Sequence, residues 1–285
     1  NFTTGNLNTD PNNVIIFGDQ SLARAYTLEF EEMWGTDGPL PDATNSRFGP
    51  LKTVNTPRKF IIGGSEVELY FSPTDGTTSA ILQAVESTDY DLSFATLSFT
   101  RNDLGAAVIE AGSSIFINPQ GAIEDVNASG SEYEALVDAG IAVYSHQGIS
   151  GQLHHKYAIV DQSETLSDPT VVTGSHNWST TAETTNDENT VVIHDARIAN
   201  LYYQEFQGML NAMGVGIHEA GAAEPTCRIY PNPASTSFTV ELTENASIGE
   251  WMELRDAMGR LVLREQIQSL RASIDVSGLA RGHYL

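Results

Sequence analysis

A histidine and a lysine two positions apart are the first side chains of this 285-residue chain that could act together in a reaction. They are His154 and Lys156, and Asp161 follows after four intervening residues. Alternate side chains of a β-strand share a face, so the spacing predicts that His154 and Lys156 point into one site. His155 lies between them and would face the other way, as a structural or wall residue.

A hydroxyl and an amide follow in a second short segment, where Ser175 and Asn177 again share a strand face. Histidine can attack phosphorus or transfer a proton near neutral pH. Lysine supplies positive charge to the non-bridging oxygens, where charge builds in the transition state. This set of groups suits a phosphate diester, and it calls for neither a metal nor a cofactor.

An acidic partner is needed to fix the imidazole tautomer and stabilise the imidazolium. Glu188 is our candidate, and a solvated loop acid is the alternative reading of the same residue. Asp161, at or just past the end of the strand, is either a member of the catalytic set or a structural anchor. His176 is expected to pack inside the fold.

The two segments resemble the phospholipase D superfamily, whose motif is H-x-K-x4-D followed by G-S-x-N. The resemblance covers roughly residues 1–211 and implies a mixed α/β sheet flanked by helices. It also implies two motif copies per active site and a phosphohistidine intermediate. The candidate catalytic residues are His154, Lys156, Asp161, Asn177 and Glu188. The candidate phosphate-binding residues are Lys156, Ser175, Asn177 and Asn1.

An internal repeat supports this reading, because residues 1–35 align without gaps on residues 177–211. Matched pairs include Asn1 with Asn177, Asn13 with Asn189, Asp19 with Asp195, Tyr26 with Tyr202 and Glu29 with Glu205. Each copy is predicted to form a strand and then an amphipathic helix. Asn12 stands where the second copy has Glu188. We expect the His-x-Lys motif of the first copy to precede residue 1, which would make the chain a fragment.

Strand-like and helix-like segments alternate between the two copies, as in a layered α/β domain. Strands are predicted over 61–73, 90–99 and 113–119, helices over 78–88 and 104–111, and a helix and a strand within 132–146. We predict five parts: the end of a first repeat (1–35), a linker (36–58), a second repeat (59–211), a linker (212–225) and a small C-terminal domain (226–285).

The C-terminal segment resembles the sorting domain of the type IX secretion system of Bacteroidetes. The resemblance rests on Ile229–Pro233, Asp256–Arg260 and Leu279–Tyr284, in that order. It implies a small all-β, sandwich-like domain and a secreted or cell-surface protein that the type IX machinery handles. The family pattern usually continues beyond Tyr284, so we expect this end to be truncated as well.

The bulk composition bears on the substrate. The formal net charge is −23 and the isoelectric point is about 4.4, which disfavours broad binding to nucleic acid. No apolar run is long enough to span a membrane. Cys227 is the single cysteine, so neither an intramolecular disulfide nor a cysteine zinc site is expected.

These observations predict a secreted phosphodiesterase, with a phospholipid as the favoured substrate. The alternatives are an extracellular endonuclease of the same superfamily and a non-catalytic surface-binding module. The two repeats are expected to pair within one chain, and the pairing of two chains into a homodimer is the alternative.

Overall fold

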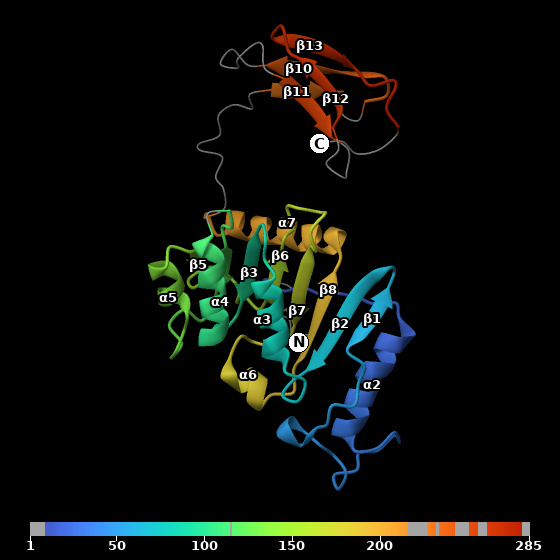
Figure 1. Ribbon diagram of the computed structural model, residues 1–285, viewed down its shortest axis with the longest axis vertical. Helices are drawn as coiled ribbons and strands as arrows, with labels where there is room; N and C mark the ends of the chain where they lie inside the picture. The colour runs from blue at the N-terminus through green and yellow to red at the C-terminus, as the bar shows by residue number, and fades with distance from the viewer. Residues whose placement is uncertain are drawn as a thin grey trace. The chain divides into compact units, whose positions relative to one another are not determined.

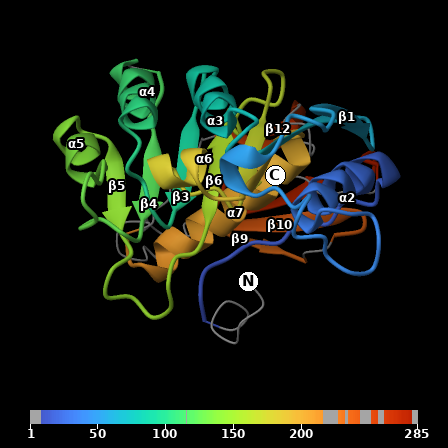
Figure 2. The ribbon, with the colours of Figure 1, turned by 90° about the horizontal axis from the view of Figure 1, so that it is seen from below.

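The computed structural model describes residues 9–114, 116–215, 227–231, 234–242, 251–255 and 261–280. The chain divides into two compact units, residues 1–216 and 217–285, and each is described by itself. The larger unit is a mixed eight-stranded sheet with helices on both faces (Figures 1 and 2). The predicted α/β fold class is confirmed.

The sheet has the strand order β1-β2-β8-β7-β6-β3-β4-β5. Its strands are β1 (Lys59–Ile62), β2 (Ser65–Phe71), β3 (Leu92–Thr96), β4 (Gln120–Ile123), β5 (Ala142–Ser145), β6 (Lys156–Val160), β7 (Thr170–Gly174) and β8 (Asn189–His194). Strands β3, β4 and β5 are parallel, and the other neighbours are antiparallel. Since β6 begins, β7 ends and β8 begins at the same edge, the segments around 154–156, 174–177 and 188–189 meet there.

Both faces of the central strands are buried, as the unbroken apolar run in β6 requires. Helices α3 (Thr77–Glu86), α4 (Asn102–Ser113) and α5 (Tyr133–Asp138) cover one face. Helices α2 (Gln20–Trp34) and α7 (Ala196–Ala212) cover the other. Tyr157 and Ile159 pack toward α7, whereas Ala158 and Val160 pack toward α3 and α4. The short helix α6 (Thr180–Thr184) follows the 174–177 segment.

The helical half of the repeat is present in both copies. Asp19 caps α2 by accepting the amide hydrogen of Leu22 at 2.8 Å. Its repeat partner Asp195 caps α7 by accepting from the amides of Arg197 and Ile198 at 2.9 and 3.2 Å. Side-chain caps of this kind satisfy amide groups that have no partner within the helix.

The strand predicted in the first copy is wrong for the described residues 9–19, which contain no strand. Exposure nevertheless alternates along 11–19, as in an extended chain. Ile15 and Phe17 pack against the core beneath α2, while Val14 and Ile16 are exposed. The alternation of apolar residues in the sequence therefore indicates an extended chain correctly, but it does not indicate whether that chain pairs with a neighbouring strand.

Two further strand predictions differ from the structure. The single strand predicted over 61–73 is a hairpin of β1 and β2, because Gly63 and Gly64 turn the chain with φ of 63° and 96°. The strand predicted over 113–119 is absent from the described residues of that range. The strand starts at Gln120 instead, directly after Pro119, which has no amide hydrogen to donate to a sheet.

The smaller unit contains two antiparallel sheets. One has β9 (Cys227–Tyr230), β10 (Ser237–Leu242) and β13 (Arg271–Asp275), and the other pairs β11 (Trp251–Arg255) with β12 (Leu261–Gln266). The described part of this unit is therefore all-β, as the resemblance implies. Residues 276–280 contain no strand, and residues 281–285 lie outside the described chain. The buried apolar side chains are those of Phe238, Val240, Ile267 and Ile274.

No helix within the described ranges is both long and apolar enough to cross a bilayer.

Candidate functional site

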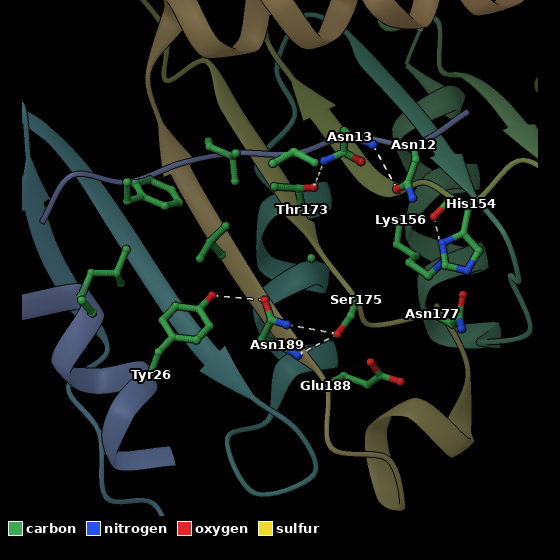
Figure 3. A pocket seen from close by; sticks show the side chains of 17 residues that line it. Asn12, Asn13, Tyr26, His154, Lys156, Thr173, Ser175, Asn177, Glu188 and Asn189 are labelled. Atoms are coloured by element: carbon green, nitrogen blue, oxygen red, sulfur yellow. Dashed lines mark hydrogen bonds between the residues drawn. The ribbon is translucent and has the colours of Figure 1, made fainter. Parts of the chain in front are cut away.

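A cavity of about 820 Å³ opens at the edge of the sheet where β6, β7 and β8 meet. Five candidate residues line it: His154, Lys156, Ser175, Asn177 and Glu188 (Figure 3). The structure thus brings together side chains that are up to 34 positions apart in the sequence. Of the other candidates, Asp161 does not line the cavity, and Asn1 lies outside the described residues.

Hydrogen bonds fix the backbone just before β6. The amide of His154 donates to the carbonyl of Pro11 at 2.9 Å. The ammonium of Lys156 donates to the carbonyl of His154 at 2.8 Å, and Lys156 is only 6% exposed. The two side chains therefore reach the same cavity, which is the arrangement that the spacing of two predicts.

Lys156 is the principal positive charge on the cavity wall, and burial lowers its pKa from 10.5 to about 8. The nearby carboxylates of Glu188 and Asp125 oppose this fall. The pKa of His154 is also lowered, first by burial and then by the charge of Lys156. His154 is therefore biased toward the neutral imidazole, and Lys156 carries the positive charge at neutral pH.

Ser175 and Asn177 offer polar atoms to a ligand. The Ser175 amide donates to the Asn189 carbonyl at 2.9 Å, and the Ser175 hydroxyl oxygen accepts from the Asn189 amide at 3.1 Å. The hydroxyl can still donate its own proton. The side-chain oxygen of Asn177 is buried without a hydrogen-bond partner in the described structure. A buried polar atom of this kind is costly unless a ligand or water meets it.

Glu188 lines the cavity together with Lys156, and its negative charge favours the protonated form of that lysine. Its carboxylate accepts from the side-chain amide of Asn186 at 3.1 Å. Asn12, its counterpart in the first repeat, lines the same cavity. The orientation of an imidazole by Glu188 stays a prediction.

Asp161 lies at the far end of β6, where its backbone has a φ of 53°. One carboxylate oxygen accepts from the amides of Asp89 and Tyr90 at 3.0 and 2.9 Å. The other accepts from the hydroxyl of Ser167 at 2.7 Å. With both oxygens engaged and only 1% of the residue exposed, Asp161 ties the end of β6 to the chain that enters β3. Of the two readings of Asp161, this placement supports the structural anchor.

His155 belongs to a buried network behind the cavity that residue spacing does not reveal. Its ring nitrogens lie 2.9 Å from the Asn13 side-chain oxygen and 3.1 Å from a Glu205 carboxylate oxygen. The other oxygen of Glu205 accepts from the Tyr157 hydroxyl at 2.7 Å. His155 therefore fixes the backbone between His154 and Lys156 from the opposite face of the sheet.

Two tyrosine–asparagine hydrogen bonds connect the repeat copies. Asn13 donates to the Tyr202 hydroxyl at 2.8 Å, and the Tyr26 hydroxyl donates to Asn189 at 3.1 Å. The tyrosines and asparagines are equivalent pairs in the repeat alignment, so each copy supplies the tyrosine for the asparagine of the other. The alignment contained the signal, but the sequence analysis gave these residues no role.

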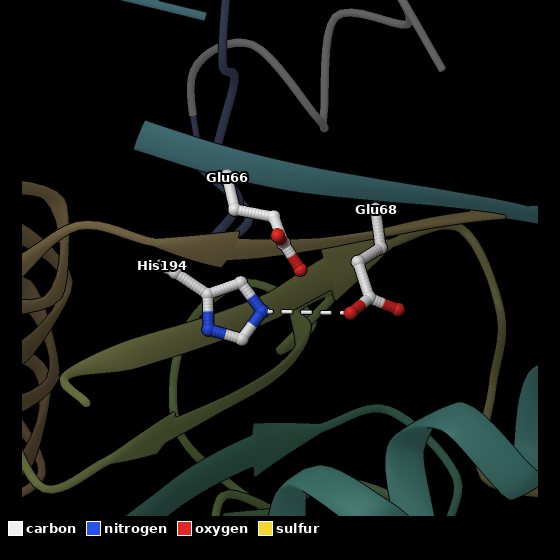
Figure 4. A group of neighbouring side chains, drawn as sticks. All are labelled: Glu66, Glu68 and His194. Atoms are coloured by element: carbon white, nitrogen blue, oxygen red, sulfur yellow. Dashed lines mark ion pairs between the residues drawn. The ribbon is translucent and has the colours of Figure 1, made fainter. Parts of the chain in front are cut away.

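Glu66, Glu68 and His194 form a separate cluster on β2 and β8 (Figure 4). Their potential ligand atoms lie within 4.8 Å of one another, and so could approach a cation. The Lys59 ammonium already lies 2.7 and 3.1 Å from the two carboxylates. Since the Lys59 ammonium already contacts both carboxylates, we assign no metal to the cluster.

Comparisons with known proteins find a different family model in each of the two units of the chain. Residues 81–210 match the family model described as "Cardiolipin synthase, PLD-like domain". Residues 228–285 match the "Secretion system C-terminal sorting domain". The second match indicates a secreted or cell-surface protein that uses the type IX secretion machinery.

Among similar proteins, the mitochondrial cardiolipin hydrolase of Xenopus tropicalis is 44% identical over 80 residues, 28% of this chain and 35% of the relative. The Chlamydomonas reinhardtii protein of the same name is 27% identical over 177 residues, 62% of this chain and 70% of the relative. The matched region spans 35% to 58% of the length of the mitochondrial cardiolipin hydrolases of Xenopus tropicalis, Xenopus laevis and Mus musculus.

Among solved structures, Nuc of Salmonella typhimurium, a phospholipase D family member, is 26% identical with a TM-score of 0.45. The match covers 52% of this chain and 95% of Nuc. The family matches and the spaced motifs show that this chain carries a phospholipase D-like domain of the phosphodiesterase superfamily, followed by a type IX secretion sorting domain.

Proposed function

We propose that the protein is a secreted phospholipase D-type phosphodiesterase that hydrolyses a phospholipid. The observation that carries the proposal is the convergence of His154, Lys156, Ser175 and Asn177 on one cavity. An imidazole, an ammonium, a hydroxyl and a side-chain amide are the groups that a diester phosphate needs for attack, charge neutralisation and orientation.

The proposed reaction has two displacements at phosphorus and uses two histidines. One imidazole nitrogen attacks phosphorus, a P–N bond forms, and the bond to the leaving oxygen breaks as the second histidine gives that oxygen a proton. Water then attacks the phosphohistidine, loses a proton to the second histidine, and breaks the P–N bond. By resemblance, His154 is the acid and base. Lys156 and Asn177 hold the phosphate oxygens.

The preference for a phospholipid rests on the two unlike ends of the cavity. The polar candidates gather at one end, and apolar side chains line the other (Figure 3). The apolar side chains that line the cavity include those of Val14, Ile15, Phe17 and Leu22. An apolar wall beside a phosphate site suits the glycerol and acyl region of a lipid. The net charge of −23 disfavours a polyanion, and the relatives described above are named cardiolipin hydrolases.

The test compares phosphatidylcholine, cardiolipin, single-stranded DNA and double-stranded DNA as substrates of the same preparation, in the presence of EDTA. His154→Ala is the control, and it should lower hydrolysis by at least about 10²-fold, because it removes a general acid and base. Hydrolysis of a lipid that is lost in this variant supports the proposal. Hydrolysis of DNA alone would favour the endonuclease, and binding without turnover would favour the surface module.

A further inference from the structure

A buried lysine in the segment between α2 and β1 contacts the loop that carries Glu188. Lys52 follows the short 3₁₀ helix η1 (Gly49–Leu51), and its side chain is only 1% exposed. Its ammonium forms an ion pair with Glu29 of α2 and lies 3.1 Å from the Asp187 carboxylate. The amide of Gly49 donates to the same Asp187 oxygen at 2.8 Å.

Ser72 connects Lys52 to the backbone on both sides of Asp187. The Lys52 ammonium donates to the Ser72 carbonyl at 2.8 Å. The Ser72 amide donates to the Glu188 carbonyl at 3.0 Å, and the Ser72 hydroxyl donates to the Asn186 carbonyl at 3.0 Å. Ser72 is fully buried, so water does not compete for these bonds. We call Glu29, Lys52, Ser72 and Asp187 the Lys52 cluster.

The loop held in this way presents Glu188 to the cavity. Glu188 is the largest influence that favours the charged form of Lys156, against the burial that disfavours it. A small movement of Glu188 would change that attraction, because charge interactions in a partly buried site are weakly screened. The Lys52 cluster therefore fixes the position of the loop whose glutamate influences the charge state of Lys156.

The second repeat uses the equivalent glutamate in a related way. Glu205, which aligns with Glu29, contacts His155 directly behind the His154–Lys156 pair. Glu29 contacts Lys52 behind Glu188. One position of the repeat thus anchors both sides of the cavity, each time through a buried basic side chain from another segment.

We propose that Lys52 is a positioning residue for the site, which holds the 186–188 loop so that Glu188 faces Lys156. The proposal rests on the proposed function of this cavity. A purely structural ion pair is the competing explanation, since many buried pairs serve no site. The two differ in their effect on Lys156, because no hydrogen bond joins Lys52 to Lys156 in the described structure.

The test uses the full chain and a variant that removes both charges of the buried pair, Glu29→Gln with Lys52→Met. Neutralising both partners leaves no unpaired charge at Glu29 or Lys52. The Asp187 carboxylate loses its cation, but it is partly exposed and keeps the hydrogen bond from the Gly49 amide. The readout is the pKa of the Lys156 ammonium, followed by NMR titration. If the loop is released, the pKa should fall below its starting value of about 8, in the same direction as in Glu188→Gln.

A double-mutant cycle between the paired variant and Glu188→Gln shows whether both changes act on the same interaction. Adding Glu188→Gln to the paired variant should lower the Lys156 pKa no further, because both changes remove the same interaction. Asp187→Asn keeps the buried Glu29–Lys52 pair and removes the charge that attracts Lys52 to the loop, so it should act in the same direction even if the paired variant folds poorly. Lys59→Met is the matched control, since it loses two carboxylate contacts away from the cavity.

An unchanged Lys156 pKa in the folded paired variant and in Asp187→Asn, beside a clear fall in Glu188→Gln, would overturn the positioning role. The same variants are then assayed for phospholipid hydrolysis, where the alkaline limb of activity should move to lower pH. If the unmodified protein hydrolyses no diester, the proposed function fails, yet the Lys156 titration still decides the role of Lys52.

Discussion

Lys156 sets the expected pH dependence of the site. Its ammonium is charged below its pKa of about 8 and neutral above it. Since we propose that the charged form binds the phosphate oxygens, substrate hydrolysis should fall as the pH rises through about 8. Initial rates of phospholipid hydrolysis between pH 6 and 10, at constant ionic strength, measure this limb.

Lys156→Arg is the informative control for this limb. Arginine stays charged throughout the range, so the variant should lose the alkaline limb even if its overall rate falls. A limb that persists unchanged in this variant would assign the titration to another group. The lowered pKa of His154 acts at lower pH, where the protonated fraction that can donate a proton to the leaving oxygen falls as the pH rises.

At the scale of elements, Asp161 is expected to matter for stability rather than for chemistry. It accepts from three backbone amides and one hydroxyl, and all four hydrogen bonds are partly buried. Asp161→Ala should lower the free energy of unfolding by about 1–3 kcal/mol, because it leaves the amides unsatisfied. Urea unfolding measures the loss, with Asp168→Ala, an exposed carboxylate on the same connection, as the control.

Phosphate binding separates the two readings of Asp161. Inorganic phosphate should bind folded Asp161→Ala about as well as it binds the unmodified protein, since the residue does not line the cavity. A variant that unfolds normally but no longer binds phosphate would return Asp161 to the catalytic set.

The reciprocal tyrosine–asparagine bonds predict that the two repeat copies stabilise each other. Tyr26→Phe removes the bond to Asn189, and Tyr202→Phe removes the bond from Asn13. Each change should cost about 1 kcal/mol of stability, with the buried ring itself retained. Urea unfolding of the two variants, beside Tyr90→Phe at an exposed position, tests this. Costs no larger than that of the control would show that these bonds contribute nothing.

The sequence predicts the elements of this domain where its local signals are unambiguous. The motif spacing anticipates that His154, Lys156, Ser175 and Asn177 share one site, and the repeat anticipates both helices, α2 and α7. Prediction from the sequence fails where contacts with distant segments determine the structure. Residues 11–19 show the alternation of a strand, but they have no partner strand. The Lys52 cluster is equally invisible, because a lone lysine in a Pro- and Gly-rich segment has the appearance of an exposed linker residue.

At the scale of the whole molecule, the activity that we expect depends on how many catalytic histidines meet in one site. The proposed reaction uses two of them, whereas the 285 residues contain one His-x-Lys motif. Two chains that pair their motifs would complete the site. We therefore expect the specific activity of this chain to rise with protein concentration, in step with the fraction of dimer measured by analytical ultracentrifugation.

Mixing variants turns that expectation into a strict test. His154→Ala and Lys156→Ala chains would each be inactive alone, and a site formed by both still lacks one group from each motif. Mixing either of them with the unmodified chain should lower the activity of the paired sites as mixed dimers form. Activity that is independent of concentration, and unaffected by an excess of His154→Ala chains, would mean that a single chain acts without a second motif. That outcome would remove the two-histidine reaction from the proposal and leave Lys156 and the polar end of the cavity to support a different chemistry.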